Sequence, residues 1–191
     1  MSNASKGFSL IEMLLVIAII MIIAAIATTG SGSYRSRQLR AASMQLYGDL
    51  QKTRVDAMTK STANRGSRGF GIRLNSSSSY AIFEFQDDPN NTGVVAGSDN
   101  NFHDDGGAEE ALVKSTTLPD GVTVTVGAVC SGCDANVLIF NKQGLAKGTT
   151  WAGGGRTFIV QLSGIADARC LVLADVRIRE GIWNGSKCTK Q

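Results

Sequence analysis

Glu12 is the one charged side chain between Phe8 and Ala27, and its carboxylate stands inside an otherwise apolar run. An ionised group in hydrocarbon costs at least about 2.5 kcal/mol on insertion scales, so it needs a partner or a function. If the chain is cut between Gly7 and Phe8, the new amino terminus is an ammonium group that can approach Glu12 of a staggered neighbouring copy. Leaving either buried charge unpaired would cost about 3–5 kcal/mol. Glu12 is therefore a candidate for an ion pair between copies.

This carboxylate must be positioned by the apolar segment of twenty residues from Phe8 to Ala27. At about 1.5 Å per residue, a helix over this segment is roughly 30 Å long, enough to cross a bilayer once. A secretory signal peptide would be cleaved after Ala25 to Ala27, and an ordinary transmembrane anchor would stay in place, but neither gives Glu12 a purpose. A helix that is kept after cleavage at Gly7 and packs against other copies gives Glu12 an ion-pair partner. On these residues alone, all three interpretations remain open.

The stretch KGFSLIE, from Lys6 to Glu12, and the apolar run behind it resemble the class III signal of type IV pilins and pseudopilins. The resemblance implies that a prepilin peptidase cuts after Gly7, that the new amine of Phe8 is methylated, and that the segment becomes a filament core. It implies three partners: other pilin subunits, the peptidase and an inner-membrane assembly platform. Many major pilins carry proline where Thr29 stands, whereas this chain has glycines at 30 and 32, so we expect the helix to bend or melt there.

The remaining sequence predicts one more helix and a sheet. A stripe at the helical period predicts an amphipathic helix from Ser33 to about Thr62, and its members are Leu39, Ala42, Leu46, Leu50, Ala57 and Met58. Short β-branched runs predict six strands, at residues 70–74, 80–85, 122–126, 137–140, 157–162 and 170–178. Six strands after one helix indicate an α+β fold with an antiparallel sheet.

The order of these predicted elements along the chain also resembles that of pilins. We expect a leader at 1–7, a transmembrane or filament-core helix at 8–29, an amphipathic helix at 30–64 and an antiparallel β-sheet head at 65–191. Three stretches further resemble the H-type minor pseudopilins of type II secretion and their pilus counterparts: LYGDLQKTRVDAMTKSTANRG, VLIFNKQGLAKG and LVLADVRIREG. That resemblance implies a minor subunit, with few copies per filament, that helps to initiate assembly or to cap the tip.

All four cysteines lie in the C-terminal third, at Cys130, Cys133, Cys170 and Cys188. Behind a membrane segment they indicate an oxidising compartment and disulfides. Three pairings are possible, and we favour Cys130 with Cys133 and Cys170 with Cys188, because the second bond would fasten the C-terminal tail. A zinc site at CSGC lacks a second matching cysteine pair, and His103 is far upstream, so we expect no metal there.

Charge is unevenly distributed along the chain, although the net charge is only +3. Residues 34–73 carry nine Lys/Arg against Asp49 and Asp56, whereas residues 87–110 carry seven Asp/Glu and no Lys/Arg. Such segments are usually solvated faces, but complementary faces could also dock neighbouring copies.

Two local clusters contain residue types that can bind a ligand. The acidic loop from Asp99 to Glu110 has oxygen ligands at calcium-like spacing, yet Asp104 stands where the turn needs glycine, so we interpret it as a solvated loop. The basic cluster has members Lys60, Arg65, Arg68 and Arg73 beside Phe70. It could bind a nucleic-acid backbone, but we expect Phe70 in the core and consider nucleic acid an improbable partner.

The sequence contains no convincing catalytic set, so we expect no enzyme activity, no cofactor and no metal. His103 is the single histidine, and no serine lies in a Gly-x-Ser-x-Gly elbow. Residues 153–156 open a strand and not a helix, so they lack a phosphate-binding helix terminus. We expect a minor pilin or pseudopilin of a type IV pilus, competence or type II secretion system, held in the bacterial inner membrane by a single pass with a periplasmic head. The alternative is a DNA- or surface-binding module exported with a pilin-like signal.

Overall fold

The computed structural model describes residues 9–60, 68–86, 110–127, 136–147, 156–174 and 177–190, and for residues 26–33, 68, 86, 110 and 147 it describes the backbone alone. The chain divides into two compact units, residues 1–37 and 38–191.

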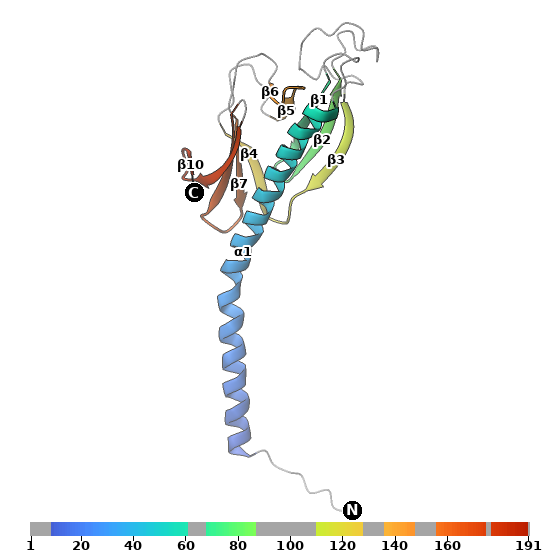
Figure 1. Cartoon of the computed structure of the whole chain (residues 1–191). Coiled ribbons are helices and arrows are strands. Elements are labelled where there is room, and N and C mark those ends of the chain that lie inside the picture. Colours follow the sequence, from blue (N-terminus) through green and yellow to red (C-terminus); the bar gives the residue numbers. More distant parts are fainter. Residues whose placement is uncertain are drawn as a thin grey trace, which may run out of the picture. The chain divides into compact units, whose positions relative to one another are not determined.

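Helix α1 runs from Leu10 to Lys60 (Figure 1). It begins directly after Ser9, whose backbone carbonyl accepts the N–H groups of Glu12 at 3.0 Å and Met13 at 3.3 Å. The backbone is helical at residues 30 and 32, so the prediction that the helix melts there is wrong. A glycine costs about 1 kcal/mol in a helix interior, which a long cooperative helix on both sides of it can absorb.

In the described residues of the second unit, ten strands form two five-stranded antiparallel sheets. Sheet A has the order β3-β2-β1-β5-β6, and sheet B has the order β10-β9-β8-β7-β4. The strands are β1 (Arg68–Ser76), β2 (Ser79–Gln86), β3 (Glu110–Thr117), β4 (Val122–Val126), β5 (Val137–Phe140), β6 (Ala146–Lys147), β7 (Arg156–Leu162), β8 (Ala168–Ala174), β9 (Arg177–Trp183) and β10 (Cys188–Lys190). A helix followed by antiparallel sheets confirms the predicted α+β, pilin-like architecture.

The strand prediction was incomplete in two respects. Strands β3, β6 and β10 were missed, because they are short or polar and lack a clear apolar alternation. The run from Cys170 to Ile178 was predicted as one strand, but β8 ends at Ala174 and β9 begins at Arg177 as its antiparallel neighbour. Branched apolar residues lie on both sides of the point where the chain reverses between β8 and β9, so amino-acid composition alone does not reveal the turn.

The second half of α1 packs on the inner faces of both sheets and forms the main core with them (Figure 1). Leu39, Leu46 and Leu50 are at most 2% exposed, and they share one cluster with residues of sheets A and B. This confirms the predicted buried stripe except at Met58, whose side chain is 43% exposed. The stripe stabilises the head because each fully buried aliphatic side chain contributes about 1.5–3 kcal/mol.

A second, smaller cluster lies on the opposite face of sheet A, around Phe83, Phe85 and Ile139. Phe83 is paired in register with Gly71, and a Cβ atom added to Gly71 would collide with Cζ of the Phe83 ring and lie 2.9 Å from the carbonyl oxygen of Leu138. The absence of a side chain at Gly71 therefore lets the Phe83 ring lie against the backbone of β1.

Replacing Gly71 with alanine should lower the free energy of unfolding by about 2–3 kcal/mol, because the new methyl group overpacks the Phe83 ring and the β5 backbone. Gly48 provides the matched control: nothing lies within 4 Å of an added Cβ there. Gly48→Ala should raise the unfolding free energy by about 0.5–1 kcal/mol, since alanine favours the helix. Urea denaturation of both variants measures the difference, and equal effects of the two changes would contradict the packing argument.

Candidate functional site

The described N-terminal part of α1 exposes apolar side chains on every side. Twelve large apolar residues between Leu10 and Ile23 are between 44% and 80% exposed. A helix that is apolar all round is normally buried in a membrane or a protein core. Within its own unit this surface has no cover among the described residues, so it needs lipid or other protein chains.

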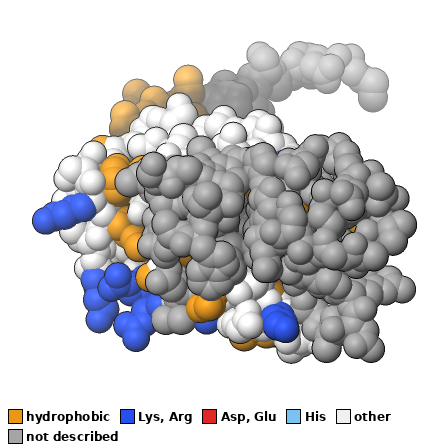
Figure 2. Space-filling view, turned by 90° about the horizontal axis from the view of Figure 1, so that it is seen from above, with side chains coloured by type: hydrophobic (Ala, Val, Ile, Leu, Met, Phe, Trp, Pro, Cys, Tyr) orange, Lys and Arg blue, Asp and Glu red, His pale blue; other side chains and the backbone are white. Residues whose placement is uncertain are grey.

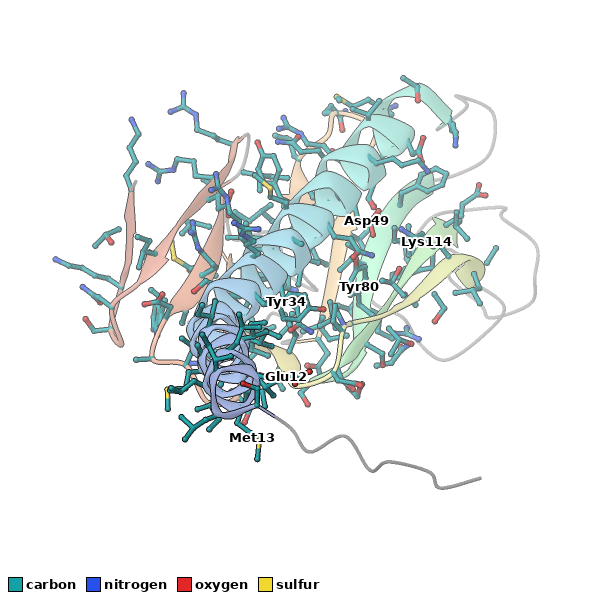
Figure 3. All side chains as sticks on the ribbon, turned by 90° about the horizontal axis from the view of Figure 1, so that it is seen from below. Glu12, Met13, Tyr34, Asp49, Tyr80 and Lys114 are labelled. Atoms are coloured by element: carbon teal, nitrogen blue, oxygen red, sulfur yellow. A yellow bond between two sulfur atoms is a disulfide. The ribbon has the colours of Figure 1, made fainter. Side chains whose placement is uncertain are left out.

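Glu12 lies in the first turn of α1, among these apolar side chains, with Met13 beside it (Figure 3). Ser9 and Glu12 also have the Ser-x-x-Glu spacing of a capping box, and a carboxylate in the first turn faces the positive end of the helix dipole. Glu12 therefore has two candidate roles, which are capping its own helix and pairing with another copy. The sequence analysis missed this role, although the four-residue pattern could have revealed it.

Several predicted residues lie outside the described part of the chain. Gly7 and Phe8, the predicted cleavage and methylation positions, are among them. In the segments that the structure describes, no helix combines the length and apolar character needed to cross a membrane. Cys130, Cys133 and the acidic loop up to residue 109 also fall outside the description.

A disulfide joins Cys170 of β8 to Cys188 of β10, with their Cα atoms 5.8 Å apart. Both strands neighbour β9, and the bond passes close to Gly181, where an added Cβ would lie 2.8 Å from the Cys188 sulfur and would collide with the Thr189 carbonyl. The bond therefore ties the last described strand to sheet B. It is the pairing that the sequence analysis favoured for these two cysteines.

The predicted basic cluster does not form a base-stacking surface in its described part. Phe70 is 3% exposed and belongs to the main core, as expected, with the Lys60 ammonium 5.8 Å from its ring centroid. The Arg73 guanidinium lies 5.5 Å from the ring centroid of Phe83. Arg65 lies outside the described residues. Both aromatic rings near this cluster are thus already covered by the protein.

Arg156 opens β7, in agreement with the expectation that residues 153–156 lead into a strand. Its side chain is 1% exposed, and Nη1 donates a hydrogen bond to the backbone carbonyl of Val137 in β5. This buried guanidinium therefore links sheet B to sheet A.

A polar contact joins α1 to sheet A through Asp49 (Figure 3). The Tyr80 hydroxyl of β2 donates to Asp49 Oδ2 at 2.7 Å, and Lys114 Nζ of β3 lies 2.9 Å and 2.8 Å from the two carboxylate oxygens. Asp49 is 8% exposed and Tyr80 is fully buried. Burial, followed by the hydrogen bond to Asp49, raises the pKa of the Tyr80 hydroxyl far above its ordinary value. Tyr80 therefore remains a proton donor at physiological pH.

A second polar contact joins α1 to sheet B. The Ser43 hydroxyl donates to Glu180 Oε1 at 3.1 Å, and Arg169 Nη1 lies 3.9 Å from the same oxygen. The two contacts, one to each sheet, fix the register of the helix on the head. Each contact combines a hydrogen bond from a hydroxyl group to a carboxylate with an ion pair to a basic side chain.

Asp56 forms i, i+4 ion pairs within α1, with Lys60 Nζ at 2.9 Å and Lys52 Nζ at 3.4 Å. Burial raises the pKa of this carboxyl, but hydrogen bonds and attraction from the two lysines outweigh it and hold the pKa below its ordinary value of 3.8. The ion pairs therefore contribute their full stability above that value and lose it as pH falls through the lower folded pKa.

We expect Asp56→Asn to cost less than about 1 kcal/mol at pH 7, because both lysine side chains are more than half exposed. The variant and the parent should converge as the pH falls below the folded pKa of Asp56, where the parent has lost the same interaction. Urea titrations at pH 7 and at a series of acidic pH values test this, and a difference that stays unchanged throughout the series would contradict it.

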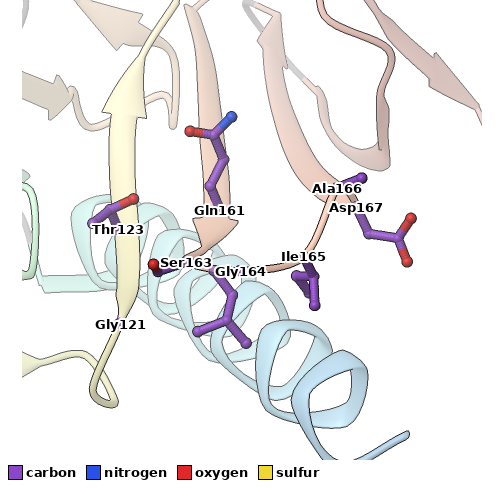
Figure 4. Close-up of a pocket in the computed structure, with 9 residues that line it drawn as sticks. Gly121, Thr123, Gln161, Ser163, Gly164, Ile165, Ala166 and Asp167 are labelled. Carbon is purple, nitrogen blue, oxygen red and sulfur yellow. The ribbon is translucent and has the colours of Figure 1, made fainter. Parts of the chain in front are cut away.

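A shallow hollow of about 290 Å³ lies between the start of β4 and the turn from β7 to β8 (Figure 4). Small and polar side chains line it, including Thr123, Gln161 and Ser163, and Asp167 is its one ionisable residue. A single exposed carboxylate cannot supply both the acid and the base of a hydrolytic reaction. The hollow therefore shows no catalytic arrangement.

Comparison with known proteins identifies the N-terminal segment. Residues 2–28 match the family described as the prokaryotic N-terminal methylation motif. This family is structural rather than catalytic. No solved structure matches the chain. The motif, followed by a helix and antiparallel sheets, supports a type IV pilin-like protein that is processed by a prepilin peptidase.

Proposed function

We propose that this chain is a minor pilin or pseudopilin, a subunit that helps to initiate or cap a type IV pilus or a type II secretion pseudopilus. In this proposal the chain is held in the bacterial inner membrane by the apolar segment at 8–29 with its head in the periplasm. A prepilin peptidase removes residues 1–7, and Phe8 becomes a methylated amino terminus. The assembly platform then transfers the subunit into a filament of other pilins.

The observation that carries this proposal is the uncovered apolar surface of α1 from Leu10 to Ile23, which lies within the methylation motif at residues 2–28. Covering one such side chain contributes about 1.5–3 kcal/mol, so twelve of them supply on the order of 20 kcal/mol. This energy favours lipid before assembly and a bundle of like helices after it. A continuous helix suits both surroundings, because all its backbone polar groups are satisfied internally.

Glu12 gives the bundle its register in this proposal. Once residues 1–7 are removed, the Phe8 ammonium of one subunit pairs with the Glu12 carboxylate of an adjacent subunit. Apolar packing alone tolerates sliding along the helix axis, whereas a buried ion pair is satisfied in one axial offset. Glu12 thus selects the stagger, and the apolar residues supply most of the binding energy.

The intact mass of the protein recovered from bacterial membranes tests the proposal. We expect a chain that begins at Phe8 and is heavier by one methyl group than its sequence requires. A chain that begins at Thr28 would instead identify a secretory signal peptide and a free head. A chain that retains residues 1–7 in cells with an active peptidase would also overturn the proposal.

A further inference from the structure

The connection between β9 and β10 contains the one Asn-Gly pair of the sequence, Asn184 and Gly185. Both residues are exposed. A Cβ atom added to Gly185 would have no atom within 4 Å, so no described neighbour shields this glycine. A backbone nitrogen reaches the side-chain amide of the preceding residue most easily when its own residue is glycine, because no side chain obstructs the approach. The pair is therefore a candidate for a reaction between main chain and side chain.

The Gly185 nitrogen is available as the nucleophile of such a reaction. Among the residues that the structure describes, none accepts a hydrogen bond from the Gly185 N–H group. The φ angle of 94° lies in a region that glycine adopts without strain. The nitrogen can therefore react without first breaking a hydrogen bond within the described part of the chain.

The side-chain amide of Asn184 is held by the turn as the electrophile. Its Oδ1 atom accepts hydrogen bonds from the backbone N–H groups of Ser186 at 3.1 Å and Lys187 at 2.9 Å, and from the Ser186 hydroxyl at 3.1 Å. The Asn184 N–H donates to the Lys187 carbonyl at 3.2 Å, which closes the turn. When a nucleophile adds to an amide carbon, negative charge develops on the oxygen, and donors already aimed at that oxygen stabilise it. The turn therefore supplies three such donors before any reaction begins.

From this arrangement we infer that Asn184 is a site of non-enzymatic deamidation, at which the turn converts the side-chain amide into a carboxylate. The Gly185 nitrogen forms a bond to Asn184 Cγ and gives up its proton, the bond from Cγ to Nδ2 breaks, and ammonia leaves. The product is a five-membered succinimide ring. One water molecule then opens the ring at either carbonyl and yields aspartate or isoaspartate, so the balance is one water consumed and one ammonia released. The inference does not depend on assembly into a filament.

The conversion changes both the charge and the main chain of the hairpin. Residues 177–190 carry four Lys/Arg and one carboxylate, Glu180. Lys and Arg side chains gather on the side of Figure 2 that corresponds to β10 in Figure 1. Each conversion adds one negative charge near Lys187. Isoaspartate also inserts an extra main-chain carbon between Trp183 and Cys188, which are partners in the strand register, so this product disturbs the pairing at the turn.

Peptide mapping by mass spectrometry tests the inference on the full-length protein in neutral detergent micelles, incubated for several weeks beside a frozen sample. The peptide that contains Asn184 should gain the mass that accompanies replacement of an amide by an acid, and it should elute as separate aspartate and isoaspartate forms. The conversion should be faster in mildly alkaline buffer than at neutral pH, because the deprotonated Gly185 nitrogen is the attacking species.

Asn141 provides the internal control in the same peptide map. Its Oδ1 atom accepts the N–H groups of Gln143 at 3.1 Å and Leu145 at 2.9 Å, but the residue is only 6% exposed and Lys142 follows it. Asn141 should remain an amide over the same period. An unchanged Asn184, or conversion of Asn184 no faster than that of Asn141, would overturn the inference.

A variant of the turn tests the part assigned to its hydrogen bonds. Ser186→Ala removes the hydroxyl donor and leaves Asn184, Gly185 and the backbone donors in place. It should slow the conversion by about two- to tenfold, the effect expected of one solvent-accessible hydrogen bond. Circular dichroism establishes that the variant is folded. Equal rates in the variant and the parent would overturn the role of the turn.

Discussion

Replacing Glu12 with alanine should leave export and cleavage after Gly7 intact but lower incorporation into filaments by about a hundredfold or more. The reason is electrostatic: the Phe8 ammonium of a neighbouring subunit would be buried in an apolar bundle without its carboxylate, at a cost of about 3–5 kcal/mol. Each 1.4 kcal/mol corresponds to a factor of ten in an equilibrium constant. Quantitative immunoblotting of membranes and sheared filaments, with the intact mass of the membrane form, measures both steps.

Two further variants separate assembly from helix capping. Ser9→Ala removes the other half of the Ser-x-x-Glu pattern, and it should incorporate almost normally if Glu12 acts between subunits. Glu12→Asp retains the charge on a shorter side chain and should recover part of the incorporation. Normal incorporation of Glu12→Ala would contradict the ion pair, and an equal defect in Ser9→Ala would show that capping is the main role.

Replacing Asp49 with alanine should destabilise the head by about 3–4 kcal/mol and lower its melting temperature by roughly 6–12 °C. The substitution removes the hydrogen-bond acceptor of the fully buried Tyr80 hydroxyl and the ion-pair partner of Lys114. Water cannot fully replace the lost carboxylate at this buried position. Thermal unfolding of the full-length protein in detergent, followed by circular dichroism, measures the effect.

A double-mutant cycle isolates the contribution of the hydrogen bond. Tyr80→Phe removes the hydroxyl without leaving a large cavity, so Asp49→Ala combined with Tyr80→Phe should cost clearly less than the sum of the single changes. Asp56→Ala is the control on the same helix, because the lysine partners of Asp56 are more than half exposed. If Asp49→Ala costs no more than Asp56→Ala, the contact between α1 and sheet A is not a major source of stability.

Regular spacing of apolar residues along the chain predicted one part of the fold and not another. The buried stripe of α1 at Leu39, Leu46 and Leu50 and five of the strands were predictable, because their apolar residues repeat at the period of the element they form. Strand β3 was not predictable in this way, since it is an edge strand whose Leu112 and Val113 are 69% and 46% exposed. An edge strand has one neighbour, so its composition is less constrained.

The polar contacts between α1 and the two sheets were not predicted from the sequence. Tyr80 and Lys114 lie 31 and 65 positions along the chain from Asp49, the helix residue that they contact, and no spacing rule connects them. Arg177 was included in a predicted strand that ran from Cys170 to Ile178, which hid the chain reversal between β8 and β9.

The sequence by itself determined the match to the N-terminal methylation motif, because the motif and its lone carboxylate in an apolar run lie close together along the chain. It also determined the α+β class, since periodicity records which side of each element is buried. The division into two sheets and the Asp49 contact were decided only by tertiary structure. These features depend on strand register and on packing between distant segments, and such long-range pairing leaves no periodic signal in the chain.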